Sequence, residues 1–301
     1  MTKATKIWLI AAAALILLGT LLFVGVMTAL KWDFEKLSTE QYETDHHTVT
    51  EAFNAISVDI NTADIALVPS ANGGCSVECY ERQNVKHTVA VRDGVLVIEV
   101  VDEREWYEHI GISTRSPWIK VYLPAGSYGA LSVKSNTGDV SIPAEFEFES
   151  VDIKEDTGDV TLRASAAGAV RIETDTGDVC VENVSAEAME ISVSTGDVEL
   201  AHVNCDSLAS TGSTGDISLK NVIVTGKLTV ERSTGDVELE ACDAAELFIE
   251  TDTGDVEGSL LSDKVFIVET DTGNKRVPDT TAGGRCEIVT DTGDVEMVIK
   301  K

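Results

Sequence analysis

The sequence predicts an all-β protein: a right-handed parallel β-solenoid of about nine coils of 19–20 residues, with an irregular β cap and one transmembrane helix before it. Three observations support this fold class. The tripeptide Thr-Gly-Asp recurs at nearly constant spacing, apolar residues alternate with polar ones on both sides of it, and a long uncharged stretch lies near the N-terminus. Aromatic residues make up only 5% of the chain, so Val, Ile, Leu and Ala must supply the core.

The charge of the chain limits its partners. Its 301 residues include 52 acidic and 23 basic side chains, which gives a formal net charge of -29. Binding to nucleic acid needs a basic surface that can neutralise phosphates, so this composition argues against a nucleic-acid partner. It also disfavours docking of the acidic part on anionic lipid head groups. With 43% hydrophobic residues the chain can form a core, which excludes a disordered acidic tail.

The first element is an uncharged apolar stretch of 24 residues, from 7 to 30, between Lys6 and Lys31. As a helix it is ~36 Å long, enough to cross a hydrocarbon layer of ~30 Å. Trp8 and Trp32 lie at its ends, where aromatic rings prefer the membrane interface. The alternative, a cleaved signal peptide, has a shorter apolar region of about 7–15 residues and a small-x-small cleavage site. We therefore expect an uncleaved anchor that enters the lipid bilayer.

Basic residues around the anchor set its orientation. Lys3, Lys6 and the α-amino group precede it, whereas Lys31 and Lys36 follow it, and this count favours a cytoplasmic N-terminus. We expect residues 1–6 to be a short cytoplasmic tail. The protein is then a single-pass protein of the bacterial cell membrane whose solenoid lies outside the cytoplasm.

Two segments connect the anchor to the repeats. Residues 31–47 are polar and show no apolar period, which predicts a stalk. His46 and His47 lie in it without a Cys or another His nearby, so we expect them to be solvated and not to bind metal. Residues 48–130 lack the strict repeat, although 56–65 is a degenerate copy of 131–140. We expect an irregular β-subdomain that caps the first coil.

The repeat governs residues 131–301, where Thr-Gly-Asp occurs eight times and Thr-Gly-Asn once, at steps of 19 or 20 residues. With glycine numbered as position 8 of each coil, apolar residues occupy positions 1, 3, 10 and 12 in nearly all coils. A spacing of two on each side of a glycine is the period of β-strands, so each coil is a strand, a sharp bend, a strand and a looser corner. The glycines of the predicted structural turns are Gly138, Gly158, Gly177, Gly196, Gly215, Gly235, Gly254, Gly273 and Gly293.

A coil of about 20 residues cannot close a core of its own. Stacking of coils ~4.8 Å apart buries the apolar columns and pairs each strand with the coils above and below it. This arrangement is a parallel β-solenoid, and the crossover preference makes it right-handed. The alternative, a β-propeller, needs blades of about 40–45 residues and does not fit the repeat.

Thr-Gly-Asp-Val coils that follow a degenerate first coil and an N-terminal membrane helix resemble the "putative adhesin" β-strand-repeat domain family, a bacterial family of unknown function. The resemblance covers about residues 48–300. It implies a β-solenoid at the cell envelope, with some relatives linked to envelope-stress systems, and it supplies no catalytic residues. The coil with Asn274, Lys275 and Arg276 departs from the pattern, so we expect irregular stacking there.

Aspartates gather at the predicted bends and form what we call the acidic edge. Carboxylates ~4.8 Å apart repel each other by about 1 kcal/mol in water, and this repulsion must be offset. Turn aspartates that accept backbone N–H groups offset it locally, whereas bound Ca²⁺ would offset it by coordination. The Gly-Gly-x-Gly-x-Asp signature of calcium-binding β-rolls is absent, so we expect structural turns and keep a Ca²⁺ ladder as the alternative. Position 9 holds Asp139, Asp159, Asp178, Asp197, Asp216, Asp236, Asp255 and Asp294, and position 6 holds Asp156, Asp175, Asp252, Asp271 and Asp291.

An enzyme is not expected. Glycoside hydrolysis needs two carboxyl groups in different environments, and an edge that repeats the same residues offers no such asymmetry. His202 is the single histidine of the repeats, and no Gly-x-Ser-x-Gly motif occurs. The sequence therefore predicts no catalytic residues and, apart from the Ca²⁺ alternative, no cofactor.

The six cysteines do not form a ladder of disulfides, because those in the repeats occupy different coil positions. Cys242 and Cys286 replace core aliphatic residues and are predicted to be buried thiols. Cys75 and Cys79 lie about 13 Å apart if their segment is extended, too far for a disulfide, whereas a turn would allow one. Unpaired cysteines are typical of an anaerobic exterior or of a cytoplasmic domain.

These features favour a non-enzymatic, membrane-anchored envelope protein whose acidic solenoid is an interaction or sensing surface, in envelope stress if the resemblance extends that far. Its expected partners are the bilayer, through the helix, and an envelope protein or a glycan. Two alternatives stay open: an extracytoplasmic adhesin for a carbohydrate or host ligand, and a cytoplasm-facing regulator of a membrane complex.

Overall fold

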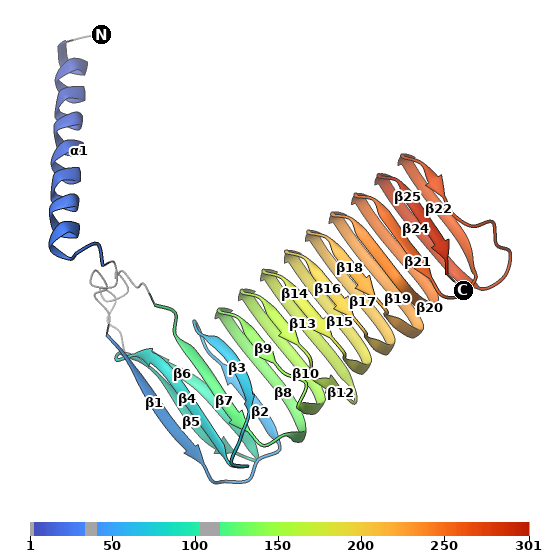
Figure 1. The fold of residues 1–301 in the computed structure, drawn as a ribbon, viewed down its shortest axis with the longest axis horizontal. Coiled ribbons are helices and arrows are strands. Elements are labelled where there is room, and N and C mark those ends of the chain that lie inside the picture. Colours follow the sequence, from blue (N-terminus) through green and yellow to red (C-terminus); the bar gives the residue numbers. More distant parts are fainter. Residues whose placement is uncertain (1–2, 34–40, 103–114, 301) are drawn as a thin grey trace.

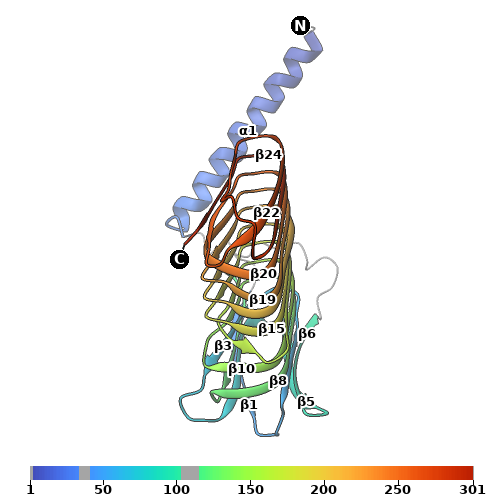
Figure 2. The same cartoon turned by 90° about the vertical axis from the view of Figure 1, so that its right-hand side faces the viewer.

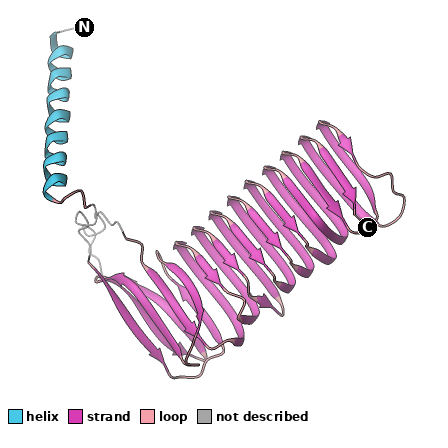
Figure 3. Ribbon diagram, in the orientation of Figure 1, coloured by secondary structure: helices cyan, strands magenta, loops and turns pink. Residues whose placement is uncertain are grey.

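A computed structural model describes residues 3–33, 41–102 and 115–300. These residues form one helix and 25 strands, and the strands wind into a long stack of coils (Figures 1 and 3). Seen from its end, the stack has a narrow cross-section in which successive coils lie over one another (Figure 2). The predicted all-β solenoid with one N-terminal apolar helix is confirmed.

Helix α1 (Lys3–Ala29) contains the apolar segment Thr5–Ala29, whose mean hydropathy is 2.7. The segment is long and apolar enough to cross a membrane, a property that an N-terminal signal sequence shares. Within it, the Thr20 hydroxyl donates a hydrogen bond to the carbonyl one turn earlier, so this polar group has a partner inside the helix.

The strands fall into three groups. The cap contains β1 (Tyr42–Val49), β2 (Ala55–Asp59), β3 (Asp64–Pro69), β4 (Cys75–Arg82), β5 (Val85–Arg92), β6 (Val95–Asp102) and β7 (Trp118–Leu123). The strands that precede the bends are β8 (Gly126–Thr137), β10 (Phe146–Thr157), β13 (Ala169–Thr176), β15 (Ser185–Thr195), β17 (Asn204–Thr214), β19 (Ile223–Thr234), β20 (Val237–Thr253), β22 (Lys264–Thr272) and β24 (Gly284–Thr292). The strands that follow the bends are β9 (Val140–Ile142), β11 (Val160–Leu162), β14 (Val179–Glu182), β16 (Val198–Ala201), β18 (Ile217–Lys220), the first part of β20, β21 (Val256–Leu260), β23 (Lys275–Arg276) and β25 (Val295–Ile299), and β12 (Ser165–Ala166) lies at a corner.

The coils stack in register, as the repeat predicts. β10 pairs in parallel with β8, so that Ile153 lies beside Val133 and Thr157 beside Thr137. Position 3 of the coil is a buried column in which Ile153 and Ile191 are 0% exposed. At the bend, Gly158 has φ +153°, and a Cβ added to it would lie 2.0 Å from the carbonyl oxygen of the preceding glycine. Only glycine therefore lets neighbouring bends approach to the strand spacing.

The cap begins with the degenerate coil that the sequence predicts. β2 pairs with β8, with Ile56 beside Leu131, and β3 pairs with β9. β6 and β7 form the next layer outward, parallel to β2 and β3. The antiparallel strands β4 and β5 then cover β7 and β6, and β1 pairs with β4 along the edge. β1 starts at Tyr42, inside the segment 31–47 for which the sequence predicts a stalk.

The last two coils stack in the reverse of their sequence order. β24 pairs with β20 on one side and β22 on the other, and β25 lies likewise between β21 and β23. The coil that contains Gly273 is therefore the outermost one, which confirms irregular stacking at this coil. Lys275 supplies the physical reason, because it takes position 10, where the other eight coils have Val or Ile. It is exposed, and a lysine at this position is tolerated only where the coil has an open side.

Candidate functional site

The acidic edge is a continuous ladder of hydrogen bonds between coils. Each position-9 aspartate uses Oδ1 to accept the backbone N–H of the equivalent residue in the next coil. Asp159 donates to Asp139 over 3.0 Å, and Asp178 donates to Asp159 over 2.8 Å. The ladder starts at Asp64 of the degenerate coil and ends at Asn274 of the outermost coil. Its other steps join Asp178, Asp197, Asp216, Asp236, Asp255 and Asp294 in order.

This geometry is the one that structural turns require. One carboxylate oxygen of each position-9 aspartate holds the neighbouring bend, and N–H groups that donate to a carboxylate favour its charged form. At the end of the ladder, the backbone and side-chain amides of Asn274 lower the pKa of Asp294 below its ordinary value. The five position-6 aspartates are exposed beside the ladder. The arrangement favours the structural interpretation of the edge, while Ca²⁺ binding there stays a prediction to be tested.

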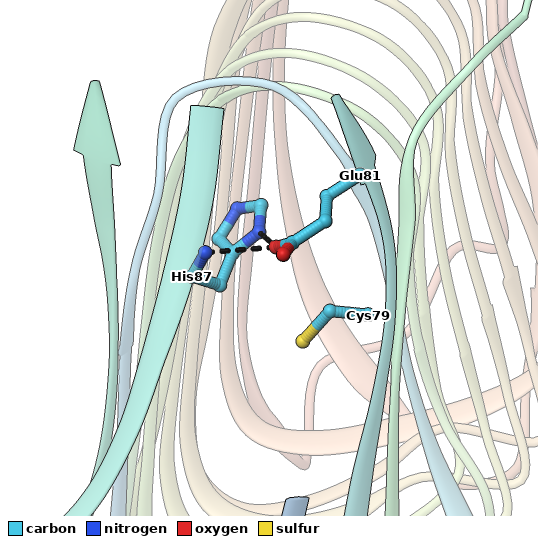
Figure 4. Close-up of side chains that lie close together, drawn as sticks. All are labelled: Cys79, Glu81 and His87. Atoms are coloured by element: carbon cyan, nitrogen blue, oxygen red, sulfur yellow. Dashed lines mark hydrogen bonds and ion pairs between the residues drawn. The ribbon is translucent and has the colours of Figure 1, made fainter. Parts of the chain in front are cut away.

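A second group of polar side chains lies inside the cap, where the sequence predicted no site. Cys79 and Glu81 come from β4 and His87 comes from β5, and we call these three residues the cap cluster (Figure 4). They are 0%, 0% and 5% exposed. One ligand-type atom of each residue lies within 4.8 Å of the other two.

Hydrogen bonds hold the cap cluster in place. Oε2 of Glu81 accepts the backbone N–H of His87 at 2.8 Å and lies 2.6 Å from His87 Nδ1. Lys86 Nζ lies 3.1 Å from Oε1 of Glu81 and 2.9 Å from Oδ2 of Asp45, and it also pairs with Glu43. Although burial opposes its charge, these carboxylates raise the pKa of Lys86 above its ordinary value. Burial, with the charge of Glu81, raises the pKa of the Cys79 thiol to about 12.

The sequence profile of the Toastrack DUF4097 family matches residues 53–301. The chain belongs to this family. No curated protein sequence matches it. The resemblance inferred from the repeats is thus confirmed. The matched residues include the acidic edge and the cap cluster but not α1 or β1.

Three solved structures are similar to this chain. The putative lipid binding protein of Parabacteroides distasonis ATCC 8503 aligns with a TM-score of 0.53 and 15% identity, over 87% of this chain and 98% of its own. The putative adhesin of the same strain aligns with a TM-score of 0.49 and 16% identity, over 86% of this chain and 98% of its own. The putative adhesin of Bacteroides fragilis NCTC 9343 aligns with a TM-score of 0.47 and 14% identity, over 86% of this chain and 97% of its own. At 15% identity, the similarity to the putative lipid binding protein shows the fold alone.

The cysteines of this Toastrack chain are all unpaired. Cys75 and Cys79 both lie in the extended strand β4, so no turn brings them together. Cys242 and Cys286 are 0% exposed, which confirms the prediction that they are core thiols. His46 and His47 lie on β1, and Nδ1 of His46 is 3.3 Å from Glu78 on the paired strand.

Proposed function

We propose that this protein is a non-enzymatic, single-pass protein of the bacterial cell envelope, held in the membrane by α1. Its solenoid lies outside the cytoplasm and is a rigid surface for a partner that binds along the acidic edge. The apolar segment Thr5–Ala29 supports the anchor, and the small excess of basic residues before it supports the orientation.

One observation carries the choice of surface: within the described residues, the carboxylates of the acidic edge form an unbroken row without ion pairs, whereas several charges on the faces of the coils are paired. On the faces, ion pairs join the same position of adjacent coils, for example Lys154 with Glu173 at 2.5 Å and Arg171 with Glu190 at 2.6 Å. Among the residues that the structure describes, no carboxylate of the acidic edge has an ion-pair partner. A row of unpaired negative charge on a rigid support attracts a partner with basic groups at matching spacing.

The test combines topology with position-specific cross-linking. Protease added to intact cells should digest the solenoid of the full-length protein. A photo-reactive residue at Ser194, on the acidic edge, should give a discrete cross-linked adduct in the membrane. The same group at Ser185, an exposed corner position, is the matched control and should not. The edge adduct should disappear at high salt, because exposed charges are then screened.

The protease test, a glycan array and the two cross-linking positions together separate the alternatives. A solenoid that protease cannot reach would indicate a cytoplasm-facing regulator. Binding on a glycan array that persists at high salt would indicate an adhesin. Equal adducts at Ser194 and Ser185 would contradict the acidic edge as the contact surface.

A further inference from the structure

The cap cluster spans β4 and β5, which follow each other across residues 83–84 but pair mainly with different strands. β4 pairs with β1 and β7, whereas β5 pairs with β6, and the two strands meet in the ladder only at Arg82 and Val85. Cys79 and Glu81 point inward from β4, and His87 points inward from β5 (Figure 4). A ligand bound by all three residues would therefore bridge the two sides of the cap.

These three side chains are the ligand types of a zinc site. Zn²⁺ binds thiolate sulfur at about 2.3 Å, imidazole nitrogen at about 2.0–2.1 Å and carboxylate oxygen at about 2.0–2.2 Å, usually with tetrahedral geometry. Tetrahedral ligands at these distances are about 3.3–3.8 Å apart. The three atoms of the cap cluster lie within 4.8 Å of one another, so small side-chain shifts bring them to this spacing. We propose that Cys79, Glu81 and His87 bind a divalent transition-metal ion of the zinc class.

A second observation concerns the ring of His87, whose Nδ1 faces Glu81 while Nε2 lies on the far side of the ring (Figure 4). Nε2 of His87 is buried and, in the described part of the chain, has no hydrogen-bond partner. A buried nitrogen without a partner is costly and calls for an explanation. The Glu81–His87 hydrogen bond satisfies only Nδ1, so a metal ion among the three residues would bind at Nδ1 and replace this hydrogen bond.

The surroundings offer room for a fourth ligand. Glu81 and His87 line a cavity of about 100 Å³ whose wall also includes Asn61, Thr62 and Arg82. A water molecule takes about 30 Å³ of liquid volume, so the cavity can hold one with polar groups around it. Three protein ligands and one water form the open type of zinc site.

The charges are also favourable. When Cys79 loses its proton to solvent, the thiolate and the Glu81 carboxylate balance a divalent ion, and His87 binds as a neutral ligand. Beyond them Lys86 pairs with Glu81, Glu43 and Asp45, and Arg82 lies in the wall of the cavity, so three carboxylates face two basic groups. A cation therefore enters a pocket whose net charge is negative, and the ion lowers the pKa of the coordinated thiol.

Cobalt is the direct probe, because a Co²⁺–thiolate bond gives a charge-transfer band in the near ultraviolet. The full-length protein, purified in detergent and treated with a chelator, should show this band with saturation at about one equivalent of Co²⁺, and Zn²⁺ should abolish it. Cys79→Ser should lack the band. Cys286→Ser is the matched control, since that thiol is equally buried on the C-terminal part of the solenoid, and it should keep the band. No band in the wild-type protein, or an unchanged band in Cys79→Ser, overturns the proposal.

Thermal unfolding of the wild-type protein gives a test that does not depend on a variant that folds. About one equivalent of Zn²⁺ should raise the midpoint with saturation, and Mg²⁺ at the same ionic strength should not. His87→Gln should lose this shift, whereas His46→Gln, which changes an exposed histidine on β1, should keep it. A Zn²⁺ shift that persists in His87→Gln, or that the wild-type protein lacks, contradicts a site at the cap cluster.

Discussion

Position 5 of the coil, just before the bend, is the place where single residues bring polar groups into the core. The Thr251 hydroxyl has a hydrogen-bond partner there, because it donates to the carbonyl of Gly235 in the preceding coil at 3.2 Å. Glu155 and Arg232 occupy the same position and are 2% and 3% exposed. Arg232 fits only because the coil beside it has Gly212, where an added Cβ would lie 1.6 Å from the guanidinium. Burial lowers the pKa of Arg232 and raises that of Glu155 to about 8.

The raised pKa of Glu155 predicts a loss of stability with rising pH. Its ordinary pKa is 4.5, so between this value and about 8 the folded protein keeps a proton that the unfolded chain has released. Stability then falls through this window and levels off above it. Glu155→Gln cannot ionise, so it should match the wild type near the lower limit and exceed it by roughly 1 kcal/mol or more above the upper one.

Urea unfolding at several pH values measures this difference. The matched control is Glu149→Gln, an exposed glutamate on the same strand β10, which should leave the pH dependence unchanged. If the wild type and Glu155→Gln show parallel pH profiles, Glu155 does not titrate as its burial predicts.

At the scale of strands, the buried column at position 3 sets the register. Ile191 on β15 is 0% exposed and lies between Ile172 and Ser210 of the adjacent coils. Ile191→Asp places a charge in this column without a partner, which should cost about 3–5 kcal/mol and lower the melting midpoint strongly. Ser192→Asp, one residue along the same strand, faces outward and should change the midpoint little. Equal effects of the two substitutions would mean that the assigned register is wrong.

The exchanged order of the last coils gives a prediction about distances. Outward-facing Phe248 and Glu287 lie side by side on β20 and β24, and Ile267 lies beyond Glu287 on β22. Neighbouring strands are about 4.8 Å apart, and a disulfide needs Cα atoms closer than about 7 Å. Mild oxidation should therefore cross-link the Phe248→Cys, Glu287→Cys pair and not the Phe248→Cys, Ile267→Cys pair. Sequential stacking would give the opposite result, and peptide mass mapping identifies the bond.

These elements also show which parts of the fold could be predicted from the sequence. The coils could be predicted, because each coil repeats a period of two around a glycine and each strand pairs with the equivalent strand one repeat away. The reversed stacking order of the last two coils could not be predicted, although Lys275 at an otherwise apolar position was a local sign of it. The cap cluster was missed for a related reason. The inward-facing residues of β4 alternate along the strand and are Val77, Cys79 and Glu81, so a glutamate in this series was the available clue. The position of its partner His87 depends on how β5 pairs with β6, which the sequence does not reveal.

At the scale of the whole molecule, the acidic edge runs the length of the solenoid as an unbroken row of like charges. Its hydrogen-bond ladder fixes each bend but does not remove the net negative charge. Mutual repulsion between exposed carboxylates should therefore weaken the folded protein at low ionic strength, and added NaCl should raise the melting midpoint through screening.

Calcium distinguishes a structural edge from a metal site. About 1 mM Ca²⁺, in the range of weak extracellular calcium sites, should raise the midpoint no more than NaCl of matched ionic strength, because each position-9 aspartate already holds the neighbouring bend. A true site would stabilise the folded protein by mass action and saturate. The measurement is thermal unfolding of the full-length protein, with the combined variant Asp236→Asn, Asp252→Asn, Asp255→Asn as the control. A saturable Ca²⁺ shift that this variant loses would make the acidic edge a cation-binding ladder, and its partner would then be a metal ion.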